Sequence, residues 1–227
     1  MSVSANEENK IFNEAYSGNI EFVKSQVEKN KNLVTTPDSN GRHLLHWAAL
    51  SGKIELVQYL LDQGSPVNHP DDIGMTPLIL SASAGKVQVC HLLISKGANV
   101  NGKNDEGHSA LQYAASKGWN DIVKMLLINH ADINVADKRG ATPLHRAASQ
   151  GKTAVVKILL DFGNQLQIDA KDIYGNTALH LSCEENRLEE AKLLVTHGAK
   201  LDVQNRDKMT PLDLAPPPLA RLLKELA

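Results

Sequence analysis

Nine histidines and two cysteines are the side chains of this chain that could bind a metal ion or supply a nucleophile. A metal site usually needs several such residues at short spacing, for example histidines at i and i+4 or two cysteines two residues apart. Cys90 and Cys183 lie far apart in the sequence, and no histidine stands four residues from another. The sequence therefore predicts no metal site and no cofactor.

Motifs of covalent or phosphate chemistry are missing as well. The sequence contains no Gly-x-Ser-x-Gly elbow, no Walker loop and no His-Glu-x-x-His pair. Adjacent acids such as Glu184 and Glu185 fall on predicted helices, where neighbouring side chains point in different directions. We predict no catalytic residues and a protein that is not an enzyme.

A short recurring segment organises the chain instead. It opens with a glycine at intervals of 33 residues, at Gly41, Gly74, Gly107 and Gly140. The most complete copy reads Gly-x-Thr-Pro-Leu-His and runs from Gly140 to His145. Thr142 can cap a helix N-terminus, and Pro143 suits the first helical position because its missing N–H would be unpaired there anyway. A helix is predicted to begin in each copy.

Each segment is followed by small residues, a glycine and a second apolar-periodic stretch, which indicates two helices per repeat. A turn plus two helices at this period, with a Thr-Pro-Leu-His signature, resembles the ankyrin repeat. The resemblance implies an all-α solenoid of seven stacked helix-turn-helix repeats forming a single domain over residues 1–227. The approximate repeats are 5–37 (N-terminal cap), 38–70, 71–103, 104–136, 137–171, 172–204 and 205–227 (C-terminal cap).

Two features break the period near the C-terminus. The fifth repeat is two residues longer than the others, which predicts a loop insertion near Asn164. Three prolines, 216–218, should end the first helix of the last repeat early and leave a short helix over Leu219–Leu226, with Leu222, Leu223 and Leu226 facing inward.

The composition of the chain bears on the kinds of partner and the cellular compartment that can be expected. Lys plus Arg number 24 against 26 Asp plus Glu, so no overall field favours nucleic acid or an anionic membrane. The first ten residues lack a signal peptide's apolar core, and no apolar run approaches the roughly 20 residues that span a bilayer. Two cysteines fit a reducing compartment. We expect a soluble monomer in the cytoplasm and nucleus.

Two recurring polar positions have a structural explanation. His46, His145 and His180 occupy the signature slot, where the imidazole is predicted to bridge backbone groups of adjacent turns. The remaining histidines are scattered over different repeats. An Asp or Asn stands three residues before each turn glycine or its equivalent, where its side chain should bond its own turn backbone. These positions are Asp38, Asp71, Asn104, Asp137, Asp172 and Asn205.

Ankyrin arrays generally bind partners on a concave side made by turn tips and one face of each first helix, so the resemblance places the binding surface there. Trp47, Tyr113 and Arg146 follow the signature position, and Lys117 lies one turn after Tyr113 on the same helix face. Aromatic and arginine anchors among polar groups are typical of a protein interface. Taken singly, each residue is equally well explained as a solvated side chain.

One linear motif offers another possibility. Leu181, Cys183 and Glu185 match the Leu-x-Cys-x-Glu sequence by which several proteins engage the retinoblastoma protein as an extended strand. Here the motif falls on a predicted first helix with Cys183 in a small-residue slot. Geometry favours a structural role, because an extended pose would require this repeat to open.

Several non-consensus segments, among them Leu45-His46-Trp47-Ala48 and Tyr113-Ala114-Ala115-Ser116-Lys117, resemble the gankyrin family of proteasome assembly chaperones over nearly the whole length. That family binds the C-terminal helical domain of a proteasomal AAA ATPase subunit. The resemblance also implies cyclin-dependent kinase 4, the retinoblastoma protein and a p53-directed ubiquitin ligase as partners. Departures from the family pattern are Asn40, Met75, Ile79 and Gln112.

The predicted function is therefore that of a scaffold and chaperone in assembly of the regulatory particle. Its expected contact residues are Arg42, Trp47, Asp71, Asp72, Met75, Tyr113, Lys117 and Arg146. The alternative is an ankyrin adaptor that regulates a cell-cycle kinase or the retinoblastoma protein. Charge reversal at Arg42 together with Lys117 should abolish ATPase binding and leave the melting temperature nearly unchanged.

Overall fold

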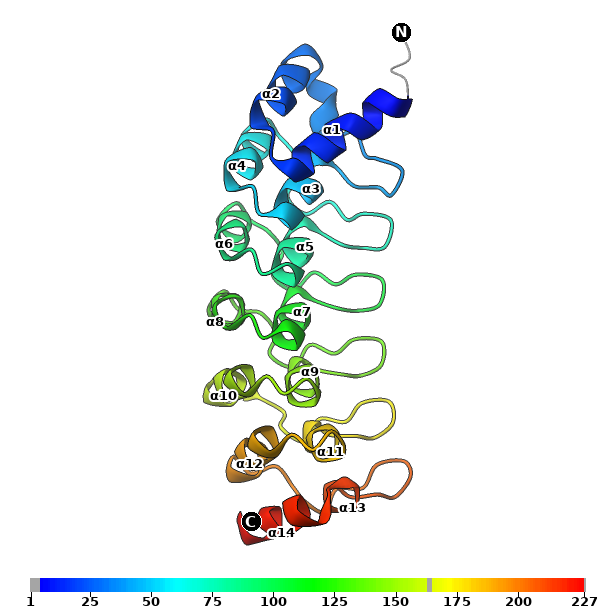
Figure 1. Cartoon of the computed structure of the whole chain (residues 1–227), viewed down its shortest axis with the longest axis vertical. Helices are drawn as coiled ribbons and strands as arrows, with labels where there is room; N and C mark the ends of the chain where they lie inside the picture. The colour runs from blue at the N-terminus through cyan, green and yellow to red at the C-terminus, as the bar shows by residue number, and fades with distance from the viewer. Residues whose placement is uncertain (1–4, 163–164, 227) are drawn as a thin grey trace. The chain divides into compact units, whose positions relative to one another are not determined.

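Helix pairs joined by short turns make up the computed structural model, which describes residues 5–162 and 165–226 (Figure 1). The internal contacts divide the chain into two compact units, Met1–Asp105 and Glu106–Ala227. Each unit repeats the same pattern of a first helix, a tight turn, a second helix and a long loop. The all-α ankyrin-repeat fold class is confirmed, whereas the single domain stays a prediction.

The first unit stacks its helices in two layers. The first helices are α1 (Ala5–Ser17), α3 (Leu44–Ser51) and α5 (Pro77–Ser83), and α3 packs between the other two. The second helices are α2 (Ile20–Lys29), α4 (Ile54–Asp62) and α6 (Val87–Ser95), and a 3-10 turn, η1 (Lys31–Val34), follows α2.

The second unit continues the pattern. Its first helices, each packed on the next, are α7 (Ala110–Lys117), α9 (Pro143–Ser149), α11 (Ala178–Glu184) and α13 (Pro211–Leu214). Its second helices are α8 (Asn120–Ile128), α10 (Thr153–Asp161), α12 (Leu188–Thr196) and α14 (Pro217–Leu226).

The recurring segment starts the first helices as predicted. Thr142 is the N-cap of α9, its hydroxyl accepts from the backbone N–H of His145, and Pro143 is the first helical residue. Thr76, Ser109, Thr177 and Thr210 cap α5, α7, α11 and α13 in the same way. Capping of this kind stabilises a helix by about 1 kcal/mol, which matters because these helices have only two turns.

Small residues let the two layers approach closely. Ala48, Ala114 and Ala147 on the first helices are fully buried, as are leucines such as Leu60 and Leu126 on the second helices. A repeat of this size buries too little apolar surface by itself, so its stability depends on its neighbours in the stack.

The turn tips are held by the acids predicted for them. Oδ1 of Asp71 accepts from the backbone N–H groups of Ile73 (3.1 Å) and Met75 (2.8 Å), and Asp137 makes the corresponding pair with Arg139 (2.8 Å) and Ala141 (3.0 Å). Asp38, Asp172 and Asn205 repeat this arrangement. The tips are therefore rigid loops with a defined shape.

The last helix departs from the sequence prediction. It begins at Pro217, two residues earlier than expected, because proline is tolerated in the first turn of a helix, where no intrahelical N–H bond is lost. Leu219 and Leu223 are buried, while Leu226 is 40% exposed and does not face inward. Asn164, where the insertion was predicted, lies outside the described residues. None of the helices in the described ranges combines the length and the apolar character that a bilayer-spanning helix needs.

Candidate protein-binding surface

The signature histidines join neighbouring turns as predicted. Nδ1 of His145 accepts from the backbone N–H of its own N-cap Thr142 (3.2 Å), and Nε2 lies 3.0 Å from the carbonyl of Asn176 in the next repeat. His180 makes the same two contacts with Thr177 and Met209. Burial lowers the pKa of both imidazoles, so they stay neutral and can accept at Nδ1 while donating at Nε2.

His46 has the same arrangement, with Nδ1 accepting from the backbone N–H of His43 and Nε2 2.9 Å from the carbonyl of His69. Burial, followed by the neighbouring His43, lowers the pKa of His46 to about 4. The histidines of the signature slot are therefore structural groups, which removes them from any list of catalytic candidates.

Sequence reasoning missed a histidine cluster at this point. The ring of His43 lies 4.2 Å from that of His69 and 5.7 Å from that of His46, although the sequence had suggested scattered residues. His43 is buried, and burial together with His69 lowers its pKa. Over the described part of the chain no group of His, Cys, Asp and Glu has the arrangement of a metal site.

Trp47 and Arg42 form the centre of a polar–aromatic cluster in the first unit. The indole Nε1 of Trp47 donates to Asp38 Oδ2 at 2.9 Å, and the guanidinium of Arg42 lies 5.0 Å from the Trp47 ring. Tyr16 meets the indole edge-on at 6.1 Å and is 51% exposed. Cation–π and aromatic contacts thus fix a partly exposed aromatic surface in one orientation.

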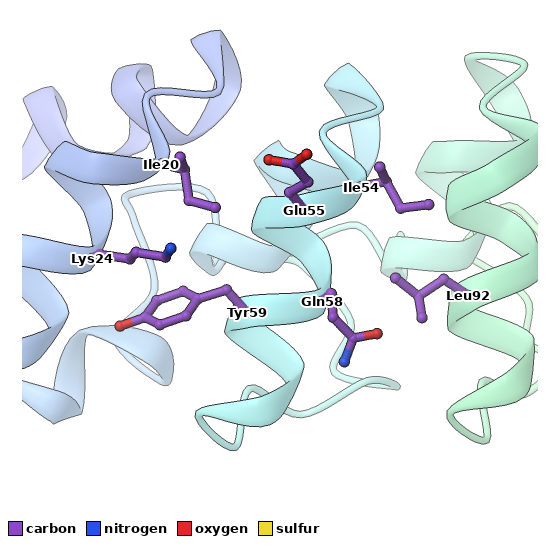
Figure 2. A pocket seen from close by; sticks show the side chains of 7 residues that line it. All are labelled: Ile20, Lys24, Ile54, Glu55, Gln58, Tyr59 and Leu92. Carbon is purple, nitrogen blue, oxygen red and sulfur yellow. The ribbon is translucent and has the colours of Figure 1, made fainter.

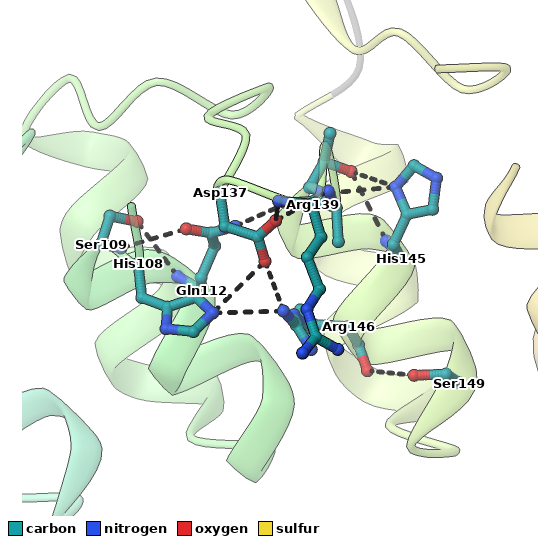
Figure 3. A network of polar contacts seen from close by, with 10 residues as sticks. His108, Ser109, Gln112, Asp137, Arg139, His145, Arg146 and Ser149 are labelled. Atoms are coloured by element: carbon teal, nitrogen blue, oxygen red, sulfur yellow. Dashed lines mark hydrogen bonds and ion pairs between the residues drawn. The ribbon is translucent and has the colours of Figure 1, made fainter. Parts of the chain in front are cut away.

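A second cluster surrounds Asp137 in the second unit (Figure 3). Its Oδ2 accepts a short hydrogen bond from Arg146 and lies 3.3 Å from Nε2 of His108, whose ring meets Tyr113 edge-on at 5.5 Å. Burial raises the pKa of Asp137, but the hydrogen bonds from Arg146 and from the Ala141 backbone outweigh it, so this pKa lies below its usual value. The carboxylate therefore stays charged and holds Arg146 in place.

The predicted contact residues fall into three groups. Asp72 and Lys117 are exposed, and neither forms an ion pair with any residue the structure describes. Arg42, Trp47, Tyr113 and Arg146 are half-buried in the two clusters. Asp71 (6% exposed) and Met75 (7%) are buried.

The burial of Asp71 and Met75 corrects their predicted role. Asp71 uses one carboxylate oxygen for its own turn and the other for Nε of Arg42 at 2.8 Å. Met75 packs inside the turn, where its sulfur lies 3.4 Å from the Asn104 amide nitrogen. Neither side chain offers surface to a partner, so both support the exposed residues around them.

The Leu-x-Cys-x-Glu motif is helical, as its position predicted. Leu181 is half-buried, Cys183 is fully buried and Glu185 is exposed at the end of α11. Burial raises the pKa of the Cys183 thiol to about 12, which keeps it protonated and unreactive. Only Glu185 of this motif is freely accessible in the folded protein.

An open hollow of about 450 Å³ lies elsewhere in the first unit, on the second helices (Figure 2). Ile20, Ile54 and Leu92 supply apolar walls, and Lys24 extends over the ring of Tyr59 at 5.5 Å. None of the predicted contact residues lines it.

Comparison with known families identifies the class of protein. A family model described as ankyrin repeats (3 copies) matches residues 11–104 and 101–172, and one described as ankyrin repeats (many copies) matches residues 159–215. The chain belongs to the ankyrin-repeat family.

Individual ankyrin-repeat proteins that are similar to this chain include a proteasome subunit. A stretch of 58 residues is 43% identical to the human 26S proteasome non-ATPase regulatory subunit 10 and 44% identical to the mouse protein. It covers 26% of this chain and about a quarter of each relative, 26% and 25%. The resemblance to this subunit, gankyrin, is confirmed over that stretch. Among solved structures, the ankyrin repeat domain of human ASB11 matches with a TM-score of 0.86 at 26% identity, covering 96% of this chain and 97% of that domain.

Proposed function

We propose that this protein is a binding scaffold that assists assembly of the proteasome regulatory particle by holding the C-terminal domain of one AAA ATPase subunit. The observation that carries the proposal is found in each compact unit by itself: the first has the cluster of Trp47 with Arg42 and an exposed charge at Asp72, and the second has the cluster of Tyr113 with Arg146 and an exposed charge at Lys117. Neither charge forms an ion pair with a described residue. The similarity to proteasome regulatory subunit 10 supports the choice of partner.

Binding energy in such an interface comes mainly from aromatic and arginine anchors that need little ordering. Both clusters meet that requirement, because hydrogen bonds to Asp38 and Asp137 already fix the side chains. Asp72 and Lys117 then supply charges of both signs for orientation. While bound, the scaffold would hinder premature docking of the ATPase subunit on the proteolytic core, in the cytoplasm and nucleus.

Arg42 is a poor residue for testing this proposal, because the structure gives it a stabilising role. Its guanidinium pairs with the buried Asp71 carboxylate, so the charge reversal suggested by the sequence would lower stability as well as binding. Asp72 and Lys117 are better targets because both are exposed.

The test compares Asp72→Lys/Lys117→Glu with Glu55→Lys/Lys157→Glu, which makes the same exchange of charges at exposed positions on second helices. We expect the first variant to bind a purified ATPase C-terminal domain at least about tenfold more weakly in calorimetry, and the second to bind like the parent. Both should keep the parent melting temperature. Equal binding by all three proteins would refute Asp72 and Lys117 as contact residues, and with them the proposed ATPase site.

A regulator of a cell-cycle kinase or of the retinoblastoma protein is the competing function. Binding of the retinoblastoma protein through the Leu-x-Cys-x-Glu motif has no direct support from the structure, because Cys183 of that motif is buried. Affinity capture from a cell lysate separates the two functions: recovery of kinases without any proteasomal ATPase would exclude the assembly role.

A further inference from the structure

Three consecutive turn tips of the second unit carry a surface that the proposed function does not use. At the two positions after the turn Asp or Asn, the tips present Lys138 and Arg139, then Ile173 and Tyr174, then Arg206 and Asp207. All six side chains are exposed; Ile173 is 39% exposed and Tyr174 is 56% exposed. The tip strip is defined here as Lys138, Arg139, Ile173, Tyr174 and Arg206.

Backbone hydrogen bonds fix these tips beside one another. The N–H of Ile173 donates to the carbonyl of Arg139 at 2.9 Å, and the N–H of Arg206 donates to the carbonyl of Tyr174 at 2.9 Å. Figure 1 shows the loops before α9, α11 and α13 following one another on the same side of the unit. Because each turn is also held by its own Asp or Asn, the strip is ordered before any partner arrives, which lowers the entropic cost of binding.

The tip strip is positively charged. The acids of the turns face inward, where Oδ1 of Asp137 and of Asp172 each accept two backbone N–H groups. Lys138, Arg139 and Arg206 make no ion pair within the described residues. Two further lysines, Lys171 and Lys208, flank the tips, and Asp207 is the exposed acid among them.

The repeat itself does not require these residue types. The same two positions hold Ser39 and Asn40 in the second repeat and Asp72 and Ile73 in the third. A turn of identical geometry therefore accepts neutral, acidic or basic side chains. An exposed tyrosine and isoleucine between two basic tips are not needed for folding, and both expose apolar surface to water.

We propose that the tip strip binds an acidic segment of a partner protein that carries a large apolar or aromatic side chain. The apolar side chain would pack on Ile173 and Tyr174, while carboxylates on either side pair with Arg139 and Arg206. Nucleic acid fits less well, because the chain has a net charge of −2, with 24 Lys and Arg residues against 26 Asp and Glu residues. The strip contains none of the residues of the proposed ATPase site.

The experiment measures the binding of synthetic fluorescent peptides by anisotropy at low salt. One peptide consists of glutamates around a central phenylalanine; the others replace the phenylalanine by alanine or the glutamates by lysines. We expect the first peptide to bind, the alanine peptide to bind several-fold more weakly and the lysine peptide not to bind. Raised salt should weaken the complex.

Variants of the whole chain identify the surface. Arg139→Glu/Arg206→Glu should weaken binding at least about tenfold, and Tyr174→Ser should remove the preference for phenylalanine. The matched control is Lys124→Glu/Lys157→Glu, which makes the same charge change on α8 and α10 and should bind like the parent. All variants should keep the parent melting temperature, because the substituted side chains are exposed.

Each contrary result rejects the proposal. Failure of the glutamate–phenylalanine peptide to bind rejects the acidic partner. If the control variant loses as much affinity as Arg139→Glu/Arg206→Glu, the loss comes from the overall charge of the protein and not from the tip strip. Tighter binding of single-stranded DNA or of phosphatidylserine vesicles would assign the strip to a different class of ligand. These results are distinguishable from failure of the ATPase proposal, which is tested with variants at Asp72 and Lys117.

Discussion

Gln112 and His145 occupy the same position in consecutive repeats and make the same two hydrogen bonds. The amide oxygen of Gln112 accepts from the backbone N–H of Ser109 at 3.0 Å, and its amide nitrogen donates to the carbonyl of Ala141 at 2.6 Å. His145 makes these contacts with Thr142 and Asn176. An uncharged glutamine thus performs the structural task of the signature histidine, and it offers a substitution that keeps the hydrogen bonds but cannot titrate.

His46→Gln should reduce the acid sensitivity of the fold. The native state holds His46 neutral with a pKa of about 4, against an ordinary value of 6.5, so the unfolded chain binds the extra proton between these values. Stability from this group is complete above pH 6.5 and is lost as the pH falls towards 4. Between pH 7.5 and pH 5 the loss should be about 2 kcal/mol, which urea unfolding at both pH values can measure.

The glutamine variant should lack this increment, so its unfolding free energy should fall by about 2 kcal/mol less than that of the parent over the same pH interval. His46→Ala serves as the control, because it also cannot titrate but loses both hydrogen bonds and is expected to be less stable even at pH 7.5. An unchanged pH dependence in His46→Gln would show that the imidazole does not titrate as proposed.

Arg42→Met should destabilise the first unit. The substitution keeps an apolar chain of similar reach but leaves Oδ2 of Asp71, whose side chain is 1% exposed, without its charged partner. An uncompensated buried carboxylate should cost about 2–3 kcal/mol. Denaturant unfolding measures this cost, and Lys117→Met is the control. The exposed Lys117 ammonium forms no ion pair with a described residue, so its loss should change stability by less than about 0.5 kcal/mol.

Adding Asp71→Asn to Arg42→Met separates the two roles of Asp71, which are to hold its turn and to pair with Arg42. Asn205 shows that an asparagine Oδ1 satisfies the same two turn N–H groups, so Asp71→Asn should keep the turn while removing the buried charge. The Arg42→Met/Asp71→Asn double variant should therefore regain part of the lost stability. Strictly additive losses would mean that the two side chains do not interact.

Gly74→Ala should be far more damaging than Gly64→Ala. Both glycines have positive φ angles, 79° and 91°, so alanine is strained at either position. At Gly64 a Cβ would meet no atom within 4 Å, whereas at Gly74 it would lie 2.8 Å from the backbone nitrogen of Asp105 and 2.9 Å from Cα of Asn104. The next tip must then move, which breaks the hydrogen bond from Asp105 N–H to the Ile73 carbonyl.

We expect about 1 kcal/mol for Gly64→Ala and about 3 kcal/mol or more for Gly74→Ala, measured by urea unfolding. The difference between the variants isolates the cost of separating two tips from the cost of the φ angle. Similar losses at the two positions would show that the tips tolerate displacement.

The local features of each repeat could be predicted from the sequence because their causes lie within a few residues. Thr142 caps the helix that Pro143 begins, and Asp137 bonds the N–H groups two and four residues later. The turn hydrogen bonds recur at Asp38, Asp71, Asp172 and Asn205, so the repetition of the motif supported the prediction. The same reasoning failed at Pro217, where a rule about proline inside helices was applied to a residue that starts one.

The partners of the polar side chains outside the capping, turn and signature-histidine pattern could be known only from the tertiary structure. Oδ2 of Asp38 and Oδ2 of Asp137 accept hydrogen bonds from Trp47 and Arg146, which belong to the same repeats as these acids. Oδ2 of Asp71 instead pairs with Arg42 from the preceding repeat. At the corresponding position in the repeat of Asp71 stands Leu80, which cannot donate a hydrogen bond. The sequence therefore placed Asp71 at the binding surface, whereas stacking of the repeats buries it.

Sequence alone thus determined the repeat, the helix starts, the turn chemistry and the fold class, because backbone hydrogen bonds and capping depend on residues close in the chain. The tertiary structure decided which predicted contact residues remain exposed, how Gln112 replaces a histidine and which tips carry Arg139, Tyr174 and Arg206 side by side. Those outcomes depend on how each repeat packs on the next, since a side chain that reaches a neighbouring repeat finds its partner about 30 residues away.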